Sequence, residues 1–200
     1  MVNNSKSGRN LRALVESALL IAVGFVLSYV SFSIPWVQGG SVTPLSMLPI
    51  MIIGIRHGLK WGLCSALVYS GLQMLQSFAA SVAWLPSPSF STLTSLVLLD
   101  YVIAFSVLGL SGLFKNKKNG LLYAIPLCIT LRFLCHFISG LVIWNVFAEA
   151  GQPVWLYSLI YNGSYMGPEL VLTMVVGAVL CSTAPFLLTV EPISTTTSES

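Results

Sequence analysis

The chain has 200 residues, of which 56% are hydrophobic and 8% are charged, and its mean hydropathy is +0.87. Soluble domains carry about 25% charged residues, so this chain has too little charge to cover a water-facing surface. The composition excludes a soluble globular protein and predicts a polytopic membrane protein. The net charge of +3 matters through its distribution along the chain, because basic residues report orientation.

Six apolar segments follow one another along the chain, and each is predicted to form a membrane helix. They cover about residues 11–33, 45–55, 61–78, 93–114, 121–147 and 155–188. The second segment is short for a full span, so we expect it to be tilted or to extend back into the preceding loop. The predicted fold class is an all-α integral membrane protein with six transmembrane helices.

The remaining segments carry polar or turn-forming residues. We expect residues 1–10 to be a cytoplasmic N-terminal tail, residues 11–188 to be one six-helix membrane domain, and residues 189–200 to be a disordered cytoplasmic tail. Residues 79–92 contain prolines and serines, which predict a loop. The first apolar run lacks the short apolar core and cleavage site of a signal peptide, so we expect it to be retained as a helix.

The basic residues predict the orientation of these helices. Eight of the nine gather at the N-terminus, after the second helix and after the fourth, and they are Lys6, Arg9, Arg12, Arg56, Lys60, Lys115, Lys117 and Lys118. With six spans these clusters fall on one side, and the three opposite loops contain neither lysine nor arginine. By the positive-inside rule, both termini are predicted to be cytoplasmic.

Polar and aromatic side chains gather in the outer half of the predicted bundle. Asp100 is expected roughly 10 Å, and His136 roughly 16 Å, from the outer ends of their helices. His136, Gly140 and Trp144 are spaced i, i+4, i+8, which places them on one helix face. The other residues expected on this side are Trp36, Tyr101, Tyr157 and Asn162. Aromatic rings around one carboxylate favour a flat cationic ligand.

Each of these residues also has a purely structural interpretation. Trp36 and Trp144 taken alone are typical of an interfacial aromatic belt. His136 taken alone could form a hydrogen bond between two helices. Asp100 is harder to explain in this way, because an isolated acid in an apolar run usually serves function.

Arg132 and Glu169 form a second polar pair in this interpretation. Both are expected near mid-membrane, on the fifth and sixth helices, where they would neutralise each other as a structural ion pair. Arg132 lies one turn below His136, so we expect it to form the floor of the site with Glu169 without touching the ligand. The alternative is that Glu169 faces the binding site itself.

At these residues the sequence resembles the ThiT family, the thiamine-specific substrate-binding subunits (S components) of energy-coupling factor transporters. The resemblance is carried by LLDYVIAFSVLGLSGLF (98–114), HFISGLVIW (136–144), LYSLIYNG (156–163) and the basic turn GIRHGLKWGL (54–63). It extends over nearly the whole chain from the first to the sixth helix. The string H-F-x-x-G-x-x-x-W followed by Y-S-L-x-x-N-G is highly specific.

The resemblance implies an S-component fold that binds thiamine near the outer surface, under the first loop. The implied lining residues are Trp36, Asp100, Tyr101, His136, Gly140, Trp144, Tyr157 and Asn162. His136 and Trp144 would flank the aromatic rings of the ligand, and Tyr157 and Asn162 would bind its aminopyrimidine. The family acid is commonly glutamate, so at Asp100 the ligand must shift or a water must bridge. The first loop also looks longer and richer in glycine than in the family.

The resemblance further implies the partners of this chain. Ala18 and Ala22 match a small-residue motif that docks the transmembrane coupling subunit, and two ATPase subunits would complete the transporter. No G-x-x-x-x-G-K-[ST] motif occurs in the chain, so partners must supply the energy. Besides thiamine and the bilayer of the bacterial cell membrane, we expect no cofactor, no metal and no nucleic acid.

Three other functions compete with thiamine capture. The first is an S component for another flat cationic vitamin or a thiamine precursor, because S components share a fold. The second is an intramembrane enzyme, suggested superficially by Ser139 beside His136, but no strained nucleophile loop or oxyanion donor accompanies this pair. The third is a scaffold protein, in which a carboxylate and an imidazole would serve no purpose. We predict a binding subunit that is not an enzyme.

Overall fold

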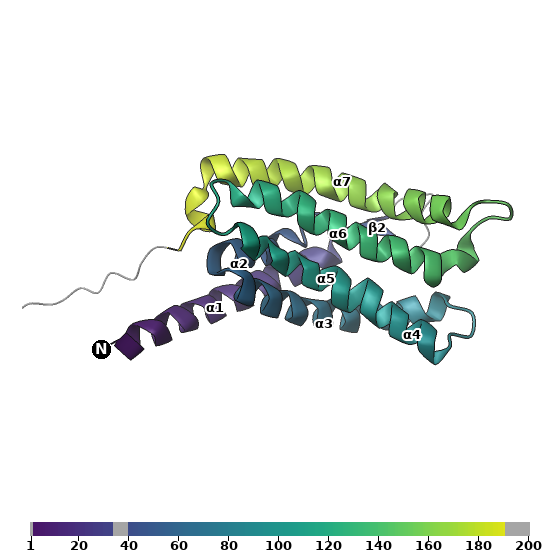
Figure 1. Ribbon diagram of the computed structural model, residues 1–200, viewed down its shortest axis with the longest axis horizontal. Helices are drawn as coiled ribbons and strands as arrows, with labels where there is room; N and C mark the ends of the chain where they lie inside the picture. Colours follow the sequence, from purple (N-terminus) through teal and green to yellow (C-terminus); the bar gives the residue numbers. More distant parts are fainter. Residues whose placement is uncertain (1, 34–39, 191–200) are drawn as a thin grey trace, which may run out of the picture.

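The structure is a computed structural model that describes residues 2–33 and 40–190, with only the backbone for residues 2–6 (Figure 1). The helices run roughly along one axis, with α7 and α6 side by side and α1 and α3 on the opposite side of the bundle. The elements are α1 (Val2–Tyr29), β1 (Phe32–Ser33), β2 (Ser41–Val42), α2 (Leu48–His57), α3 (Leu59–Trp84), α4 (Phe90–Leu96), η1 (Val97–Ile103), α5 (Ala104–Ser106), η2 (Val107–Phe114), α6 (Gly120–Val142), η3 (Trp144–Phe147), α7 (Val154–Thr183) and η4 (Pro185–Leu188).

The helical class predicted from the composition is confirmed. Within the described residues, four helical stretches are long and apolar enough to cross a membrane, and they are Ser7–Tyr29, Phe90–Phe114, Gly120–Val142 and Val154–Thr183. The other two predicted spans differ: α2 has only 10 residues, and α3 has 26 residues but is not apolar enough to qualify. A count of six membrane spans therefore stays a prediction.

Several predicted helix boundaries are wrong. The first helix, expected to reach residue 33, ends at Tyr29, and Phe32–Ser33 form β1 instead. Residues 2–10, expected to be a tail, belong to α1. Residues 79–84, expected to belong to a loop, continue α3 to Trp84 because the prolines come only at positions 86 and 88. The helix ends where Leu85 becomes extended (φ −87°, ψ 125°), which is the conformation favoured before a proline. The expected tail from residue 191 onward lies outside the described residues.

The fourth predicted helix is continuous but irregular. Residues 90–114 begin as an α-helix capped by Ser89, whose side chain accepts a hydrogen bond from the backbone N–H of Thr92. The segment continues as a wider π-helix over η1 and, after α5, as a tighter 3₁₀-helix over η2. A π-helical turn within an α-helix costs stability and is frequent at functional sites. Asp100 lies in the middle of this turn.

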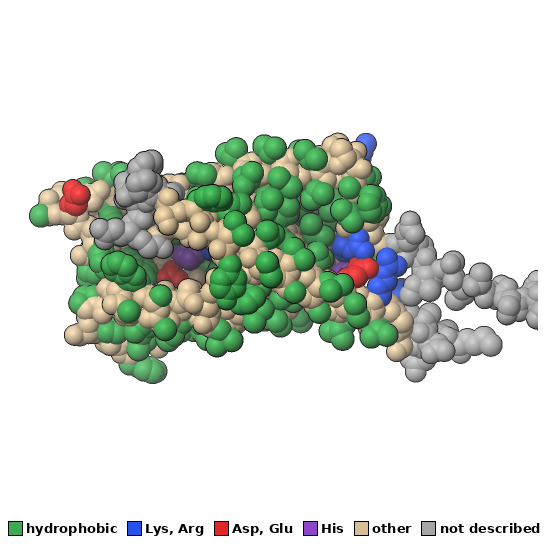
Figure 2. Space-filling view, turned by 180° about the vertical axis from the view of Figure 1, so that it is seen from behind, with side chains coloured by type: hydrophobic (Ala, Val, Ile, Leu, Met, Phe, Trp, Pro, Cys, Tyr) green, Lys and Arg blue, Asp and Glu red, His purple; other side chains and the backbone are tan. Residues whose placement is uncertain are grey.

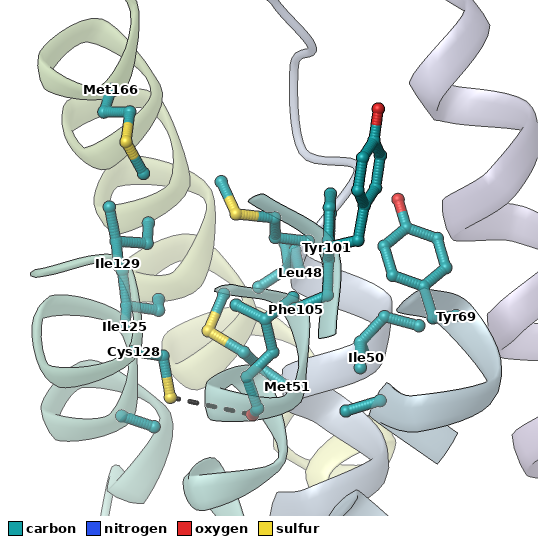
Figure 3. Close-up of a cluster of buried hydrophobic side chains, with 14 of the residues drawn as sticks. Leu48, Ile50, Met51, Tyr69, Tyr101, Phe105, Ile125, Cys128, Ile129 and Met166 are labelled. Carbon is teal, nitrogen blue, oxygen red and sulfur yellow. Dashed lines mark hydrogen bonds between the residues drawn. The ribbon is translucent and has the colours of Figure 1, made fainter. Parts of the chain in front are cut away.

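The short helix α2 forms the centre of the core. Seven of its ten residues are buried, including Ile50, Met51 and Ile53, whose exposed fractions are 0%. Figure 3 shows Met51 of α2 on the side of Ile125 and Cys128 from α6, and Ile50 of α2 on the side of Tyr69 from α3. The sequence of a helix enclosed in this way is a continuous apolar run, like that of a membrane span. Such a helix need not cross the membrane by itself, because neighbouring helices surround it.

The first loop, expected to be irregular, contains a two-stranded antiparallel hairpin. Phe32 pairs with Val42 and Ser33 with Ser41. The chain then passes through residues 43–47 into the interior of the bundle and begins α2 at Leu48. Backbone at this depth is tolerated only where protein or a cavity surrounds it. The hairpin and the segment that follows it therefore lie at the edge of the site.

A candidate ligand-binding cavity

A cavity of about 720 Å³ opens between α3, η1, α6 and α7, beside the hairpin. Ligand pockets typically have volumes of about 300–1,000 Å³, so this one can hold a small organic molecule. Figure 2 shows red and purple side chains inside a hollow at this end of the molecule. The basic residues gather at the opposite end, where blue side chains surround a red one. The cavity is thus separated from the basic end by the core around α2.

Asp100 is the centre of the polar network in this cavity. Its Oδ2 accepts a hydrogen bond from Nε1 of Trp144 at 2.9 Å, and its Oδ1 lies 3.1 Å from Nδ1 of His136. The carboxylate and the imidazole expose only 11% and 14% of their side-chain surface. A carboxylate held this far from water favours a cationic partner, because nearby protein donors solvate it only in part.

The residues predicted from the sequence meet at this cavity. Seven of them line it, and they are Asp100, Tyr101, His136, Gly140, Trp144, Tyr157 and Asn162. The eighth, Trp36, lies outside the described residues. The predicted helix face of α6 is realised, although Trp144 itself lies in the short η3 that follows α6.

Tyr101 and Asn162 already have partners within the protein. The hydroxyl of Tyr101 lies 3.1 Å from Oγ of Ser77 and 2.9 Å from Oγ of Ser81. Nδ2 of Asn162 donates to the carbonyl of Ser158 at 2.9 Å and to that of His136 at 3.3 Å. Both side chains are nearly buried, at 4% and 3% exposed. They hold α3, η1, α6 and α7 together behind the surface of the cavity.

Gly140 contributes close helix packing in addition to cavity surface. A Cβ at this position would lie 2.8 Å from Cβ of Ser158 and 3.4 Å from Nδ2 of Asn162, and it would collide with the Ser158 hydroxyl. That hydroxyl donates to the carbonyl of Phe137 at 2.8 Å. The missing side chain therefore lets α7 approach α6 at the level of the site.

Sequence reasoning missed the contribution of α3. Its residues Gln73, Gln76, Ser77, Ser81 and Trp84 line the cavity. Gln73, Ser77, Ser81 and Trp84 recur at intervals of four, four and three residues, which is the spacing of one helix face, and Gln76 lies beside Ser77. That spacing was a usable signal, but the predicted end of the helix at residue 78 cut the face in two. The same polar face explains why α3 is not counted among the apolar spans.

A row of tyrosines on α7 was also missed in part. Tyr157, Tyr161 and Tyr165 follow one another at i, i+4, i+8 and line the cavity, with ring centroids 5.7 and 5.9 Å apart. The hydroxyl of Tyr165 donates to Oδ1 of Asn162 at 2.6 Å, and its ring lies edge-on to that of His136. The cavity therefore has an aromatic wall, and the spacing of these tyrosines in the sequence indicated it.

The predicted ion pair between Arg132 and Glu169 is not formed among the described residues. Glu169 is buried, and its Oε1 accepts a hydrogen bond from the backbone N–H of Leu45 at 3.1 Å. Leu45 has a positive φ of 64° at the point where the irregular segment turns toward α2. The carboxylate thus satisfies the backbone of that segment. It does not line the cavity, so the alternative that it faces the site is not supported either.

Arg132, expected to stay clear of the ligand, lines the cavity instead. Its Nε lies 3.3 Å from Nε2 of His136, and its guanidinium carbon lies 4.2 Å from the centroid of the Phe105 ring. Among the described residues that line the cavity, the other charged side chains are the carboxylates of Asp100 and Glu149.

The remaining predicted residues lie elsewhere. Ala18 and Ala22 are on the exposed side of α1, facing away from the bundle. Ser139, the candidate nucleophile of the enzyme alternative, is fully buried and does not line the cavity.

These features define a class: a multi-pass helical membrane protein that encloses a polar and aromatic site for a small molecule near one end of its bundle. The sequence profile of the family described as "Thiamine transporter protein" matches residues 14–189. The chain belongs to this family, as its resemblance to ThiT predicted. It is therefore a transporter component of the plasma membrane and not an enzyme.

Similar proteins agree with this assignment. The chain is 35% identical to thiamine transporter ThiT of Bacillus subtilis (strain 168), over 94% of this chain and 97% of that protein. It is 31% identical to thiamine transporter ThiT of Lacticaseibacillus paracasei, over 90% of this chain and 91% of that protein. A solved structure of ThiT from Listeria monocytogenes has the same fold, with a TM-score of 0.68 and 24% identity over 91% of this chain and the whole of that one.

Proposed function

We propose that this chain captures thiamine from outside the cell in the cavity around Asp100 and delivers it inward as the S component of an energy-coupling factor transporter. The observation that carries this proposal is the buried Asp100 carboxylate, which accepts hydrogen bonds from Trp144 and His136 inside an aromatic cavity. The names of the similar proteins supply the identity of the ligand.

The chemistry of thiamine matches that of the cavity. The vitamin joins a cationic thiazolium ring to a flat aminopyrimidine. The carboxylate of Asp100 can balance the positive charge, and cation–π contacts with the rings of Trp144 and the tyrosines contribute about 0.5–2 kcal/mol each. The hydroxyl and amide groups of the α3 wall offer hydrogen bonds to the polar substituents.

The transport step is part of the same proposal. Six membrane spans with both termini in the cytoplasm would place the cavity at the outer face and the basic residues inside. A transmembrane coupling subunit would dock on the exposed face of α1 at Ala18 and Ala22, and two ATPase subunits would supply the energy. The exposure of these two alanines supports this arrangement, because no other part of the described chain covers them.

The binding step is tested by titrating the purified chain with thiamine and following its tryptophan fluorescence. Trp84 and Trp144 line the cavity, so submicromolar thiamine should quench the emission without ATP or partner subunits. Asp100→Asn should abolish the quenching, whereas the matched carboxylate variant Glu149→Gln, at the more exposed edge of the cavity, should retain most of it.

Competition separates thiamine from the other candidate ligands. The isolated aminopyrimidine and thiazole halves of thiamine, and a flat cationic vitamin of another kind, should displace thiamine only at much higher concentration. If one of these compounds bound more tightly than thiamine, that compound would become the proposed ligand in place of thiamine. Equal affinities of Asp100→Asn and the unmodified chain would refute the assignment of the site.

A further inference from the structure

Three side chains form a continuous line along one wall of the cavity. Arg132 and His136 lie one turn apart on α6, and Nε of Arg132 is 3.3 Å from Nε2 of His136. On the other side of the ring, Nδ1 of His136 is 3.1 Å from Oδ1 of Asp100 on η1. The imidazole therefore has a different charged partner at each of its two nitrogens.

The chemistry of these partners leaves one arrangement of protons. A guanidinium has only donors, so Nε2 of His136 must accept from it and cannot carry a proton. An ionised carboxylate has only acceptors, so Nδ1 of His136 must donate and must carry the proton. Both requirements are met by one neutral tautomer. A second proton on Nε2 would point at the N–H of Arg132.

We infer that Arg132 is a positioning residue, which holds His136 as the neutral tautomer with its proton on Nδ1. In this state His136 and Trp144 both donate to Asp100, one to each carboxylate oxygen. Arg132 is itself fixed by the ring of Phe105, which lies under its guanidinium. The role differs from the predicted one, in which Arg132 only neutralised a carboxylate below the site.

The neutral imidazole matters because the ligand proposed above is a cation; this functional consequence rests on that proposal. Imidazole is the side chain that ordinarily gains a proton between about pH 5 and 8. A protonated His136 would place a second positive charge beside the ligand and compete for Asp100. The neutral tautomer instead leaves the Asp100 carboxylate available to the charge of a cationic ligand, with its two oxygens oriented by His136 and Trp144.

Among the described residues that line the cavity, Arg132 is the one lysine or arginine. Asp100 from η1, Tyr165 from α7 and Arg132 from α6 itself contact the ring of His136. Within the described residues, Glu149 and Glu169 form no hydrogen bond to it.

The tautomer can be measured without any ligand. In the full chain labelled with ¹⁵N-histidine, a His57→Gln variant assigns the two imidazole signals. At about pH 7.5, His136 should show a protonated Nδ1 and an unprotonated Nε2. A proton on Nε2 at this pH would overturn the inference. Because thiamine is absent, this result is independent of whether thiamine is the ligand.

The positioning role is tested in variants of Arg132 at the same pH. Glutamine can present either its carbonyl or its amide to Nε2, so in Arg132→Gln the ¹⁵N signals of His136 should show a mixture of both tautomers, and thiamine should bind less tightly. Arg132→Lys retains a cationic donor and should keep the single tautomer, as should the matched control Arg9→Gln at the far end of α1. A single tautomer with its proton on Nδ1 in Arg132→Gln, or the same mixture in the lysine and glutamine variants, would overturn the positioning role.

Discussion

The close approach of α6 and α7 at Gly140 makes a quantitative prediction for Gly140→Ala. The added methyl would lie 2.8 Å from Cβ of Ser158, so the helices must separate locally by about 1 Å to restore ordinary contact. Overpacking of this kind costs about 1–3 kcal/mol. The separation should also break the 3.3 Å hydrogen bond from Asn162 to the carbonyl of His136, at about 1 kcal/mol.

Helix propensity opposes these losses. Alanine is favoured over glycine within a helix by about 1 kcal/mol, so the net destabilisation is about 1–3 kcal/mol. At about 2–4 °C per kcal/mol for a chain of this size, the melting temperature in detergent should fall by roughly 2–12 °C. Thiamine affinity should fall as well, because α7 carries the tyrosine wall.

A matched control lies on α7 itself. A Cβ at Gly163 would meet nothing within 4 Å, so Gly163→Ala should leave the melting temperature unchanged or raise it. Combining Gly140→Ala with Ser158→Gly removes the atoms that collide, and the two changes should therefore be less damaging together than their separate effects predict. If Gly140→Ala proves as stable as Gly163→Ala, the close approach of the two helices is refuted.

Three further predictions concern other parts of the fold. Tyr101→Phe removes the hydroxyl that joins η1 to two serines of α3 and should cost about 1–2 kcal/mol of stability, whereas Tyr123→Phe, which is 57% exposed, should cost almost nothing in thermal unfolding. Glu16→Gln weakens a network with two arginines and a histidine at the basic end, so it should lower the melting temperature more than Glu149→Gln; equal values would contradict a structural role. Ala18→Trp should abolish uptake in cells yet preserve thiamine binding by the purified chain, and loss of both would show that it disrupts the fold.

The sequence was sufficient to predict that Asp100, His136 and Trp144 meet in one place. Asp100 stood out as an acid in an apolar run, and His136 and Trp144 shared a helix face two turns long. The charge of a residue and the helical period do not depend on the details of side-chain packing. The meeting of these three side chains could therefore be inferred without coordinates.

The partners of Arg132 and Glu169 could not be predicted in the same way. Counting residues along each helix placed Arg132 and Glu169 at similar depths in the membrane. Such a count does not show whether another segment of the chain lies between the two helices. Residues 43–47 enter the bundle as irregular backbone, and the N–H of Leu45 donates a hydrogen bond to the carboxylate of Glu169. Nothing in an apolar stretch with few polar groups indicated that this segment would turn inward.

The π-helical turn around Asp100 was equally hidden. Residues 97–103 form an apolar run with neither proline nor glycine, so local propensity favours an ordinary α-helix. The wider turn is recognisable only from the contacts that it serves, in which Asp100 meets α6 and Tyr101 meets α3. Tertiary packing decides the helix type here.

The pairing of α2 with α3 has a consequence for how the protein is made. One helix has 10 residues, about half of what an independent membrane span needs, and the next is long but carries the polar face of the cavity. Only Gly58, with φ at 91°, separates them. We expect neither to leave the translocon for lipid as an independent segment. They would enter as one hairpin once later helices could shield the polar face, so biogenesis and ligand binding depend on the same side chains.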